Sequence, residues 1–128
     1  MADDKQYNLL LIEDEYDLCE IYKIQLTTHN IITDFALAGQ EGLKKIQEKK
    51  YDVVLLDLML PDMNGLEILK KIKSNDATKD IPVIINSNLS DQATVDEGLK
   101  LGAVSYIVKS SMTPDTLAAE VRKILDNN

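Results

Sequence analysis

The chain has 128 residues, a length typical of one domain, and its 45% hydrophobic and 28% charged residues are ordinary for a globular protein. Acidic residues outnumber basic ones by 22 to 14, and the net charge of −8 argues against direct binding to nucleic acid or an anionic membrane surface. The single cysteine, Cys19, excludes an internal disulfide, and no stretch resembles a signal peptide or a membrane span of about 20 apolar residues. We therefore expect a cytosolic protein, in which Cys19 serves in packing.

Five short apolar runs, bounded by turn-forming or charged residues, predict the strands of a sheet. The runs extend over residues 7–12, 31–36, 53–57, 81–85 and 105–108. Apolar residues at helical spacing predict five helices between and after these strands. The helices extend over about residues 18–29, 38–49, 65–74, 91–102 and 113–125. We accordingly divide the chain into a flexible tail (1–6), one domain (7–126) and a two-residue end (127–128).

The alternation of strands and helices predicts an α/β domain with a parallel sheet and right-handed crossovers. Asp34 inside the second run suits an edge strand, where one side meets water. The fourth helix has only Val95 and Leu99 on its apolar face, and Gly98 inside it costs about 1 kcal/mol relative to alanine. We therefore expect the segment 91–102 to be easily biased between conformations. The first helix is expected to face the core through Leu18, Ile21, Tyr22 and Leu26.

Polar residues that are unusual for a buried strand occur where the strands end. Asp57 closes the third run and is followed by a loop in which Pro61, Asn64 and Gly65 favour turns. In open parallel sheets, chemistry collects at the carboxyl ends of the strands, which meet at one edge. The sequence therefore predicts a site at this edge. Its candidate residues are Glu13, Asp14, Asp57, Ser87 and Lys109.

The carboxylates of Glu13, Asp14 and Asp57 repel one another when brought together, and each close pair costs on the order of 4 kcal/mol at an effective dielectric of about 20. A hard divalent cation such as Mg²⁺ would offset this repulsion, and Lys109 supplies a second positive charge. An aspartate beside Mg²⁺ and a lysine suits phosphoryl transfer to the carboxylate, because both cations neutralise the charge of the moving group. Ser87 is then placed to hydrogen-bond a phosphoryl oxygen.

The chain resembles the receiver domain of two-component response regulators over roughly residues 7–125. The resemblance is carried by Glu13-Asp14, by Asp57 with the following Leu-Pro-Asp-Met-Asn-Gly, and by Ser87, Tyr106 and Lys109. It implies a flavodoxin-like, doubly wound sheet of five strands in the order 2-1-3-4-5 with five helices. It also implies that Asp57 is the phosphoacceptor for a histidine kinase. Mg²⁺ would be held by Asp14, Asp57 and the backbone carbonyl of Met59, with Glu13 acting mostly through water.

The resemblance further implies a switch. Ser87 closes on the phosphoryl group while Tyr106 turns inward, which remodels the face formed by the fourth helix, the fifth strand and the fifth helix. A phosphorylation-dependent dimer through that face is one expected consequence. The expected downstream partner of this face is an unidentified protein or a covalently linked output domain. Because Asn128 directly follows the last predicted helix, the chain is either a free-standing receiver or part of a longer regulator.

Three positions depart from the pattern of the family. Glu13 stands where an aspartate is common, and its longer side chain still reaches a metal-bound water. Ser110 follows Lys109 where a proline in a cis bond is common; because a cis bond to a non-proline residue costs about 2.5–4 kcal/mol, this loop either holds that strain or runs trans. Asn88 is bulkier than the small residue usual after Ser87 and is expected to narrow access to the site.

Three other functions fit parts of this pattern. A nucleotide or flavin binder shares the sheet, but the first strand ends in the anion-repelling segment 13–15 instead of a glycine-rich phosphate cradle. A magnesium-dependent phosphatase with an aspartyl nucleophile needs the same Asp57, Lys109 and metal, together with a further acid and a substrate cap or pocket. A receiver-like scaffold that is never phosphorylated is disfavoured, since every chemical position is filled. Slow, stoichiometric phosphorylation, as opposed to rapid turnover of phosphate esters, distinguishes a signalling domain from an enzyme.

Met59 and Leu89 lie two residues beyond Asp57 and Ser87, at positions that flank the approach of water to the phosphoryl group in this family. Both are bulky and apolar, so neither orients an attacking water. We therefore expect slow self-dephosphorylation.

Overall fold

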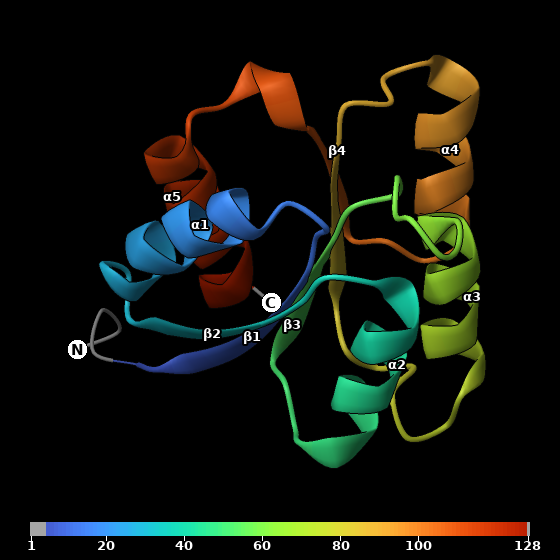
Figure 1. The fold of residues 1–128 in the computed structure, drawn as a ribbon, viewed down its shortest axis with the longest axis horizontal. Coiled ribbons are helices and arrows are strands. Elements are labelled where there is room, and N and C mark those ends of the chain that lie inside the picture. The colour runs from blue at the N-terminus through green and yellow to red at the C-terminus, as the bar shows by residue number, and fades with distance from the viewer. Residues whose placement is uncertain (1–4, 128) are drawn as a thin grey trace.

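The structure, a computed structural model, describes residues 5–127 of the chain (Figure 1). Most of the predicted tail (1–4) and the final residue lie outside the described residues. Within this range the strands are β1 (Tyr7–Ile12), β2 (Ile31–Ala36), β3 (Val53–Leu56), β4 (Val83–Ser87) and β5 (Ser105–Val108). The helices are α1 (Tyr16–Thr27), α2 (Gly39–Glu48), α3 (Gly65–Ser74), α4 (Gln92–Lys100), η2 (Lys109–Ser111, a 3₁₀ turn) and α5 (Pro114–Asp126).

The strands form one parallel sheet in the order β2-β1-β3-β4-β5, which is the order of the flavodoxin-like fold. Figure 1 shows α1 and α5 on one face of the sheet and α2, α3 and α4 on the other. The predicted fold class is confirmed. β2 is an edge strand, and Asp34 accepts hydrogen bonds there from Lys49 Nζ (3.0 Å) and the Tyr51 hydroxyl (2.8 Å). In the described range, no helix combines the length and apolar character needed to cross a membrane.

The central strands are apolar on both faces because helices cover both faces of the sheet. Along β1, Leu9 and Leu11 pack with residues of α1 and α5, whereas Leu10 and Ile12 pack with residues of α2 and α3. The same alternation in β3 and β4 produces two hydrophobic cores, one on each side of the sheet. The buried strands therefore hold the residues after their carboxyl ends in a fixed spatial relation.

The clearest difference from the predicted elements is β4, which begins at Val83 and ends at Ser87, whereas the apolar pattern placed it at residues 81–85. Asn86 and Ser87 are polar, yet they pair with two residues of β5 and continue the parallel ladder. Both are buried, with exposed fractions of 2% and 0%. Pairing with β5, and not hydrophobicity, therefore decides where β4 ends.

The buried face of α1 differs from the prediction at one position. Cys19, Tyr22 and Leu26 are buried, whereas Ile21 is 46% exposed. Cys19 packs in the core, and burial raises the pKa of its thiol to about 12, so the thiol stays protonated at neutral pH. The packing role expected for Cys19 therefore agrees with its surroundings.

The helix α4 packs against the sheet through Gly98, whereas the sequence placed Val95 and Leu99 on its apolar face. Leu99 is 44% exposed, and Gly98 is the buried residue of this helix. A Cβ atom on Gly98 would lie 2.6 Å from Ile85 Cδ1 and 3.3 Å from Tyr106 Cδ2. The lack of a side chain at Gly98 thus allows α4 to lie close to β4 and β5.

The turn after β3 depends on Gly65 and Asn64. A Cβ atom on Gly65 would lie 2.5 Å from Leu58 Cα and 2.6 Å from the Asp57 carbonyl oxygen, so only glycine fits without a backbone shift. Asn64 caps α3, because its side-chain oxygen accepts a hydrogen bond from Leu66 N at 2.8 Å. These contacts bring the start of α3 against the backbone of Asp57 and so help to fix that residue.

Candidate functional site

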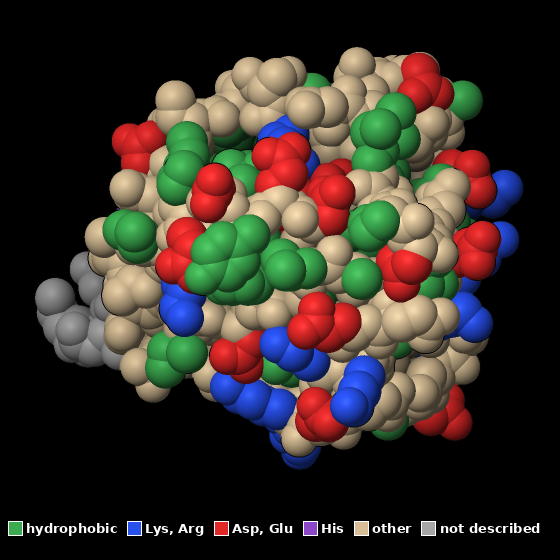
Figure 2. Space-filling model, in the orientation of Figure 1, with side chains coloured by type: hydrophobic (Ala, Val, Ile, Leu, Met, Phe, Trp, Pro, Cys, Tyr) green, Lys and Arg blue, Asp and Glu red, His purple; other side chains and the backbone are tan. Residues whose placement is uncertain are grey.

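Three carboxylates meet at the carboxyl edge of the sheet. Glu13 follows β1, Asp14 follows Glu13, and Asp57 follows β3; one oxygen from each lies within 4.8 Å of the others. Glu13 and Asp57 are 1% and 5% exposed, whereas Asp14 is exposed. On the face shown in Figure 2, acidic side chains gather near the top of the molecule beside a basic one. The parallel sheet thus brings together the acids that the sequence placed at separate strand ends.

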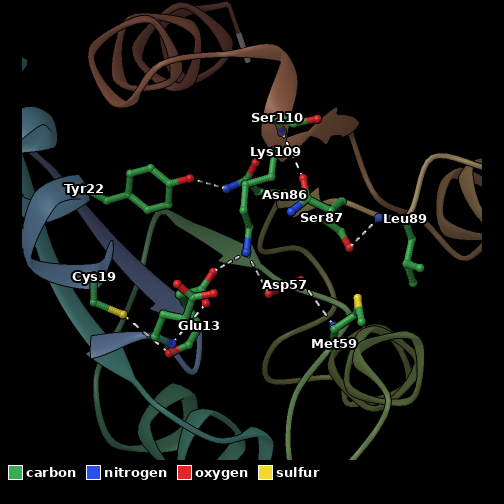
Figure 3. A network of polar contacts seen from close by, with 12 residues as sticks. Glu13, Cys19, Tyr22, Asp57, Met59, Asn86, Ser87, Leu89, Lys109 and Ser110 are labelled. Carbon is green, nitrogen blue, oxygen red and sulfur yellow. Dashed lines mark hydrogen bonds and ion pairs between the residues drawn. The ribbon is translucent and has the colours of Figure 1, made fainter. Parts of the chain in front are cut away.

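Lys109 lies between two of these acids. Its Nζ atom donates hydrogen bonds to Glu13 Oε1 at 2.7 Å and to Asp57 Oδ2 at 2.9 Å (Figure 3). Burial by itself lowers the pKa of Lys109, but the hydrogen bonds and negative charges of Glu13 and Asp57 outweigh it and raise that pKa. The lysine is therefore a fixed positive charge at neutral pH.

The other carboxylate oxygens receive backbone hydrogen bonds. Glu13 Oε2 accepts from Glu15 N at 3.1 Å, and Asp57 Oδ1 accepts from Met59 N at 3.2 Å. Burial raises the pKa of Glu13, because its charged form is withdrawn from water. Both oxygens of Glu13 are thus engaged by the chain itself, whereas the exposed Asp14 keeps its oxygens available.

The carboxylates of Asp14 and Asp57 open onto a cleft of about 260 Å³. Asp57 and Lys109 reach this cleft from the buried edge of the sheet. The cleft is lined by Asp14, Glu15, Asp57, Met59, Asn88 and Lys109. A larger cavity, of about 450 Å³, is lined by residues that precede β3 and β4 and therefore lies at the opposite edge, away from the acidic cluster.

Ser87 and Tyr106 both contact the residue Leu89 in the loop between β4 and α4. Ser87 Oγ accepts a hydrogen bond from Leu89 N at 3.3 Å, and the Tyr106 hydroxyl donates to the Leu89 carbonyl at 2.5 Å. Neither Ser87 nor Tyr106 is among the residues that line the cleft. In Figure 3, Leu89 and Met59 lie on the side of Asp57 that is opposite Glu13. Met59 is 57% exposed, whereas Leu89 is partly buried against the core.

The Lys109–Ser110 bond is trans, as are the other peptide bonds in the described residues. The sequence left both conformations of this bond open. Asn88 does not simply narrow the cleft, because its side-chain oxygen accepts a hydrogen bond from Ser110 N at 3.0 Å. No local pattern signals this hydrogen bond, which joins two loops that are separate in the sequence.

Two further contacts near the site were not expected from the sequence. Asp62, in the loop after Asp57, caps α2 by accepting hydrogen bonds from Gly39 N (2.8 Å) and Gln40 N (2.9 Å). Asn86 donates a hydrogen bond to the Tyr22 hydroxyl at 3.2 Å and so links β4 to α1 beneath the cleft. Asp62 lies next to Pro61, so a turn role was predictable, but its partner in α2 was not.

The fold and the site together define a class: a flavodoxin-like domain whose sheet edge holds an acidic cluster paired with a lysine. A sequence profile of the response regulator receiver domain matches residues 9–122. The chain belongs to this family and is the receiver domain of a two-component response regulator.

Similar proteins agree with this assignment. The response regulator ArlR of Staphylococcus aureus is 41% identical over 117 residues, which cover 91% of this chain and 52% of ArlR. This chain therefore spans about half the length of that relative. The receiver domain of the Francisella response regulator 1452 is 30% identical with a TM-score of 0.84, and the match covers 95% of this chain and 98% of that one. A CheY-like receiver domain protein from Methanospirillum hungatei is 25% identical with a TM-score of 0.86 and 96% of each chain covered.

Proposed function

We propose that this receiver domain accepts a phosphoryl group on Asp57 from the phosphohistidine of a histidine kinase, in a reaction that depends on Mg²⁺. The observation that carries the proposal is the Lys109 ammonium, which lies 2.9 Å from Asp57 Oδ2 in a cleft lined by acids. A fixed cation next to the acceptor carboxylate stabilises the negative charge that arrives with a phosphoryl group.

The transfer to Asp57 is a substitution at phosphorus. An oxygen of the Asp57 carboxylate forms a bond to phosphorus while the P–N bond of the phosphohistidine breaks. The electron pair of the broken bond returns to the imidazole nitrogen, which takes up a proton from water, and the aspartate becomes an acyl phosphate. Lys109 keeps its proton throughout, because Glu13 and Asp57 raise its pKa.

The acidic cluster fits Mg²⁺, since Mg²⁺ binds carboxylate and carbonyl oxygens and three carboxylates here offer oxygens within 4.8 Å of one another. We assign Asp14, Asp57 and the Met59 carbonyl as direct ligands. Glu13 acts through water, because Lys109 and Glu15 N already occupy its two oxygens. When bound, the ion supplies a second positive charge for the incoming phosphoryl group.

We assign Ser87 and Tyr106 as the switch that responds to phosphorylation. The Ser87 hydroxyl turns to donate a hydrogen bond to a phosphoryl oxygen and gives up its contact with Leu89 N. Because the Tyr106 hydroxyl is bonded to the carbonyl of the same Leu89, the movement of this loop releases the tyrosine. The change reaches the surface formed by α4, β5 and α5, where Leu99 and Val104 are exposed.

The α4–β5–α5 surface is therefore the proposed contact for the next component of the signalling pathway. Its occupant is a downstream protein, a linked output domain, or a second copy of this chain in a phosphorylation-dependent dimer. The net charge of −8 disfavours direct contact of this domain with nucleic acid. A cytosolic location and slow self-dephosphorylation, without turnover of other substrates, complete the proposal.

The test is intact-mass analysis after incubation with Mg²⁺ and acetyl phosphate. The wild-type protein should gain one phosphoryl group, and Asp57→Asn should gain none because the amide is not a nucleophile. Omitting Mg²⁺ should prevent the gain. Continuous release of phosphate from a simple phosphate ester, without a stable phosphorylated protein, would instead favour a phosphatase.

A further inference from the structure

Asn88 and Ser110 lie in two different loops beside the site, and they contact each other. The side-chain oxygen of Asn88 accepts a hydrogen bond from Ser110 N at 3.0 Å. A proline at position 110 has no N–H group, so the bond exists only because the residue after Lys109 is not proline. This contact therefore requires both the Asn88 side chain and a residue other than proline at position 110.

With this bond, both residues next to Lys109 are joined to the end of β4. On one side of Lys109, Val108 pairs with Ser87 in the last register position of β4 and β5. On the other side, Ser110 is tied to Asn88, the residue after Ser87. Lys109 is therefore attached to the end of β4 through both of its neighbours, and Figure 3 shows Ser110 beside Lys109 at this end of the strand.

These two attachments constrain the position of the Lys109 backbone, which the hydrogen bonds of its side chain do not constrain. Lysine has a flexible four-carbon stem, so the contacts of Nζ with Glu13 and Asp57 allow many positions of the backbone. The Ser111 hydroxyl does not tie the turn to β4, since it donates to the Val108 carbonyl at 2.6 Å within the same turn. The solvent-exposed hydrogen bond between Asn88 and Ser110 N joins this turn to the residue that follows β4.

We infer that Asn88 is a positioning residue for phosphoryl transfer to Asp57, acting through the Ser110 amide to set the position of Lys109 relative to Ser87. The inference rests on the proposed role of Asp57. It adds a second role to the expectation that Asn88 narrows access to the site, since Asn88 also lines the cleft. The position of a charged group strongly affects the rate of phosphoryl transfer, because small displacements weaken its interaction with the transferring group.

The test compares phosphorylation rates with acetyl phosphate at saturating Mg²⁺ in four proteins: wild type, Asn88→Ala, Ser110→Pro and the double variant. Asn88→Ala should lower the maximal rate about five- to tenfold. In the Ser110→Pro background the same change should have no further effect, because the donor is gone. Ser90→Ala, an exposed change in the same loop, is the control and should leave the rate unchanged.

Three measurements separate positioning from a general loss of structure. The Ser110 amide should exchange with solvent faster in Asn88→Ala than in wild type, while Mg²⁺ affinity and the midpoint of thermal unfolding stay the same. Equal rates for wild type and Asn88→Ala, or equal losses in both backgrounds, would overturn the inference while leaving phosphorylation of Asp57 intact. Absence of phosphorylation in wild type would instead refute the proposed function on which the inference depends.

Discussion

Lys109 Nζ and Glu13 Oε1 form a 2.7 Å ion pair that is almost entirely withdrawn from solvent at the end of β1. The side chains of Lys109 and Glu13 are 14% and 1% exposed, and Asp57, whose side chain is 6% exposed, shares the same ammonium. A buried carboxylate is costly unless it is paired, so two carboxylates here depend on one lysine. The exposed Asp14 adds further negative charge beside them. This excess of negative charge favours binding of a cation.

The first prediction concerns Glu13 and pH. Burial raises the pKa of Glu13 above its ordinary value of 4.5, so the folded protein holds this proton more tightly than the unfolded chain does. Stability from this group is therefore complete below about pH 4 and is lost as the pH rises through the raised value. Glu13→Gln keeps the size of the side chain and an acceptor oxygen but does not ionise. The variant therefore does not lose this stability as the pH rises.

We therefore expect the free energy of unfolding of Glu13→Gln, relative to wild type, to become more favourable between about pH 4 and about pH 7. Urea unfolding with a metal chelator present measures this difference at both pH values. Glu41→Gln, an exposed change in α2, is the control. A difference that is the same at the two pH values would mean that burial does not set the ionisation of Glu13.

The second prediction concerns Asp14 as a direct Mg²⁺ ligand. Asp14→Ala should weaken Mg²⁺ binding at least about tenfold, which corresponds to about 1.4 kcal/mol, and should abolish phosphorylation by acetyl phosphate. Because Asp14 is exposed, the metal-free protein should unfold at nearly the same temperature as wild type. Asp17→Ala removes an equivalent charge from an exposed position in the first turn of α1 and should bind Mg²⁺ normally. An unchanged Mg²⁺ titration for Asp14→Ala would remove Asp14 from the ligand set.

The third prediction concerns Gly98 and the position of α4. From helix propensity alone, Gly98→Ala should stabilise α4 by about 1 kcal/mol. The structure predicts the opposite sign, because the added Cβ meets Ile85 Cδ1 at 2.6 Å and the Tyr106 ring at 3.3 Å. We expect a net destabilisation of about 1–2 kcal/mol, with altered chemical shifts of the Tyr106 ring.

Denaturant unfolding and NMR spectroscopy test this expectation, with Glu97→Ala as the exposed control in the same helix. In wild type, the amides of α4 should exchange with solvent faster than those of β3, since α4 has one buried residue and β3 is wholly buried. If Gly98→Ala raised stability with no change at Tyr106, the close contact between α4 and the sheet would not be a constraint.

The fourth prediction concerns the lifetime of the phosphorylated state. From the sequence, Met59 and Leu89 were expected to exclude water from the phosphoryl group equally. In the structure, Met59 lines the cleft, whereas Leu89 is partly buried against the core. Met59→Asn should therefore accelerate loss of the phosphoryl group about three- to tenfold by giving the attacking water a polar partner. Leu89→Glu should contribute less and should cost stability, because it places a charge beside apolar residues.

Decay of the phosphorylated protein, followed by intact mass after removal of the phosphodonor, measures the lifetime. Met59→Leu keeps an apolar side chain of similar size and should leave the decay rate unchanged. Mg²⁺ affinity should be the same in all these variants, since Met59 contributes only its backbone carbonyl to the proposed site. A decay rate that Met59→Asn leaves unchanged or lowers would show that water access at this position does not limit the lifetime.

Local patterns in the sequence were sufficient for the order and type of the elements. Apolar runs of four to six residues, interrupted by turn residues, predict short strands, and these runs occur at all five positions of the sheet. The central strand β3 is buried on both faces, whereas the edge strands β2 and β5 are partly exposed. The polar residues that end these runs had to meet at one edge, because parallel strands present their carboxyl ends together. The acidic cluster of Glu13, Asp14 and Asp57 is a consequence of this geometry.

Tertiary structure decided the features that depend on partners distant in the chain. Pairing with β5 extended β4 through two polar residues, and the lack of a side chain at Gly98 allows α4 to lie close to Ile85 and Tyr106. Glu13 and Lys109 are 96 residues apart in the sequence, and Asn88 and Ser110 are 22 apart. Hydrophobic periodicity indicates only which side of an element is buried. It carries no information about which polar side chain, from another loop, will accept a given hydrogen bond, and that choice is made when the strands pair and the loops at their ends come together.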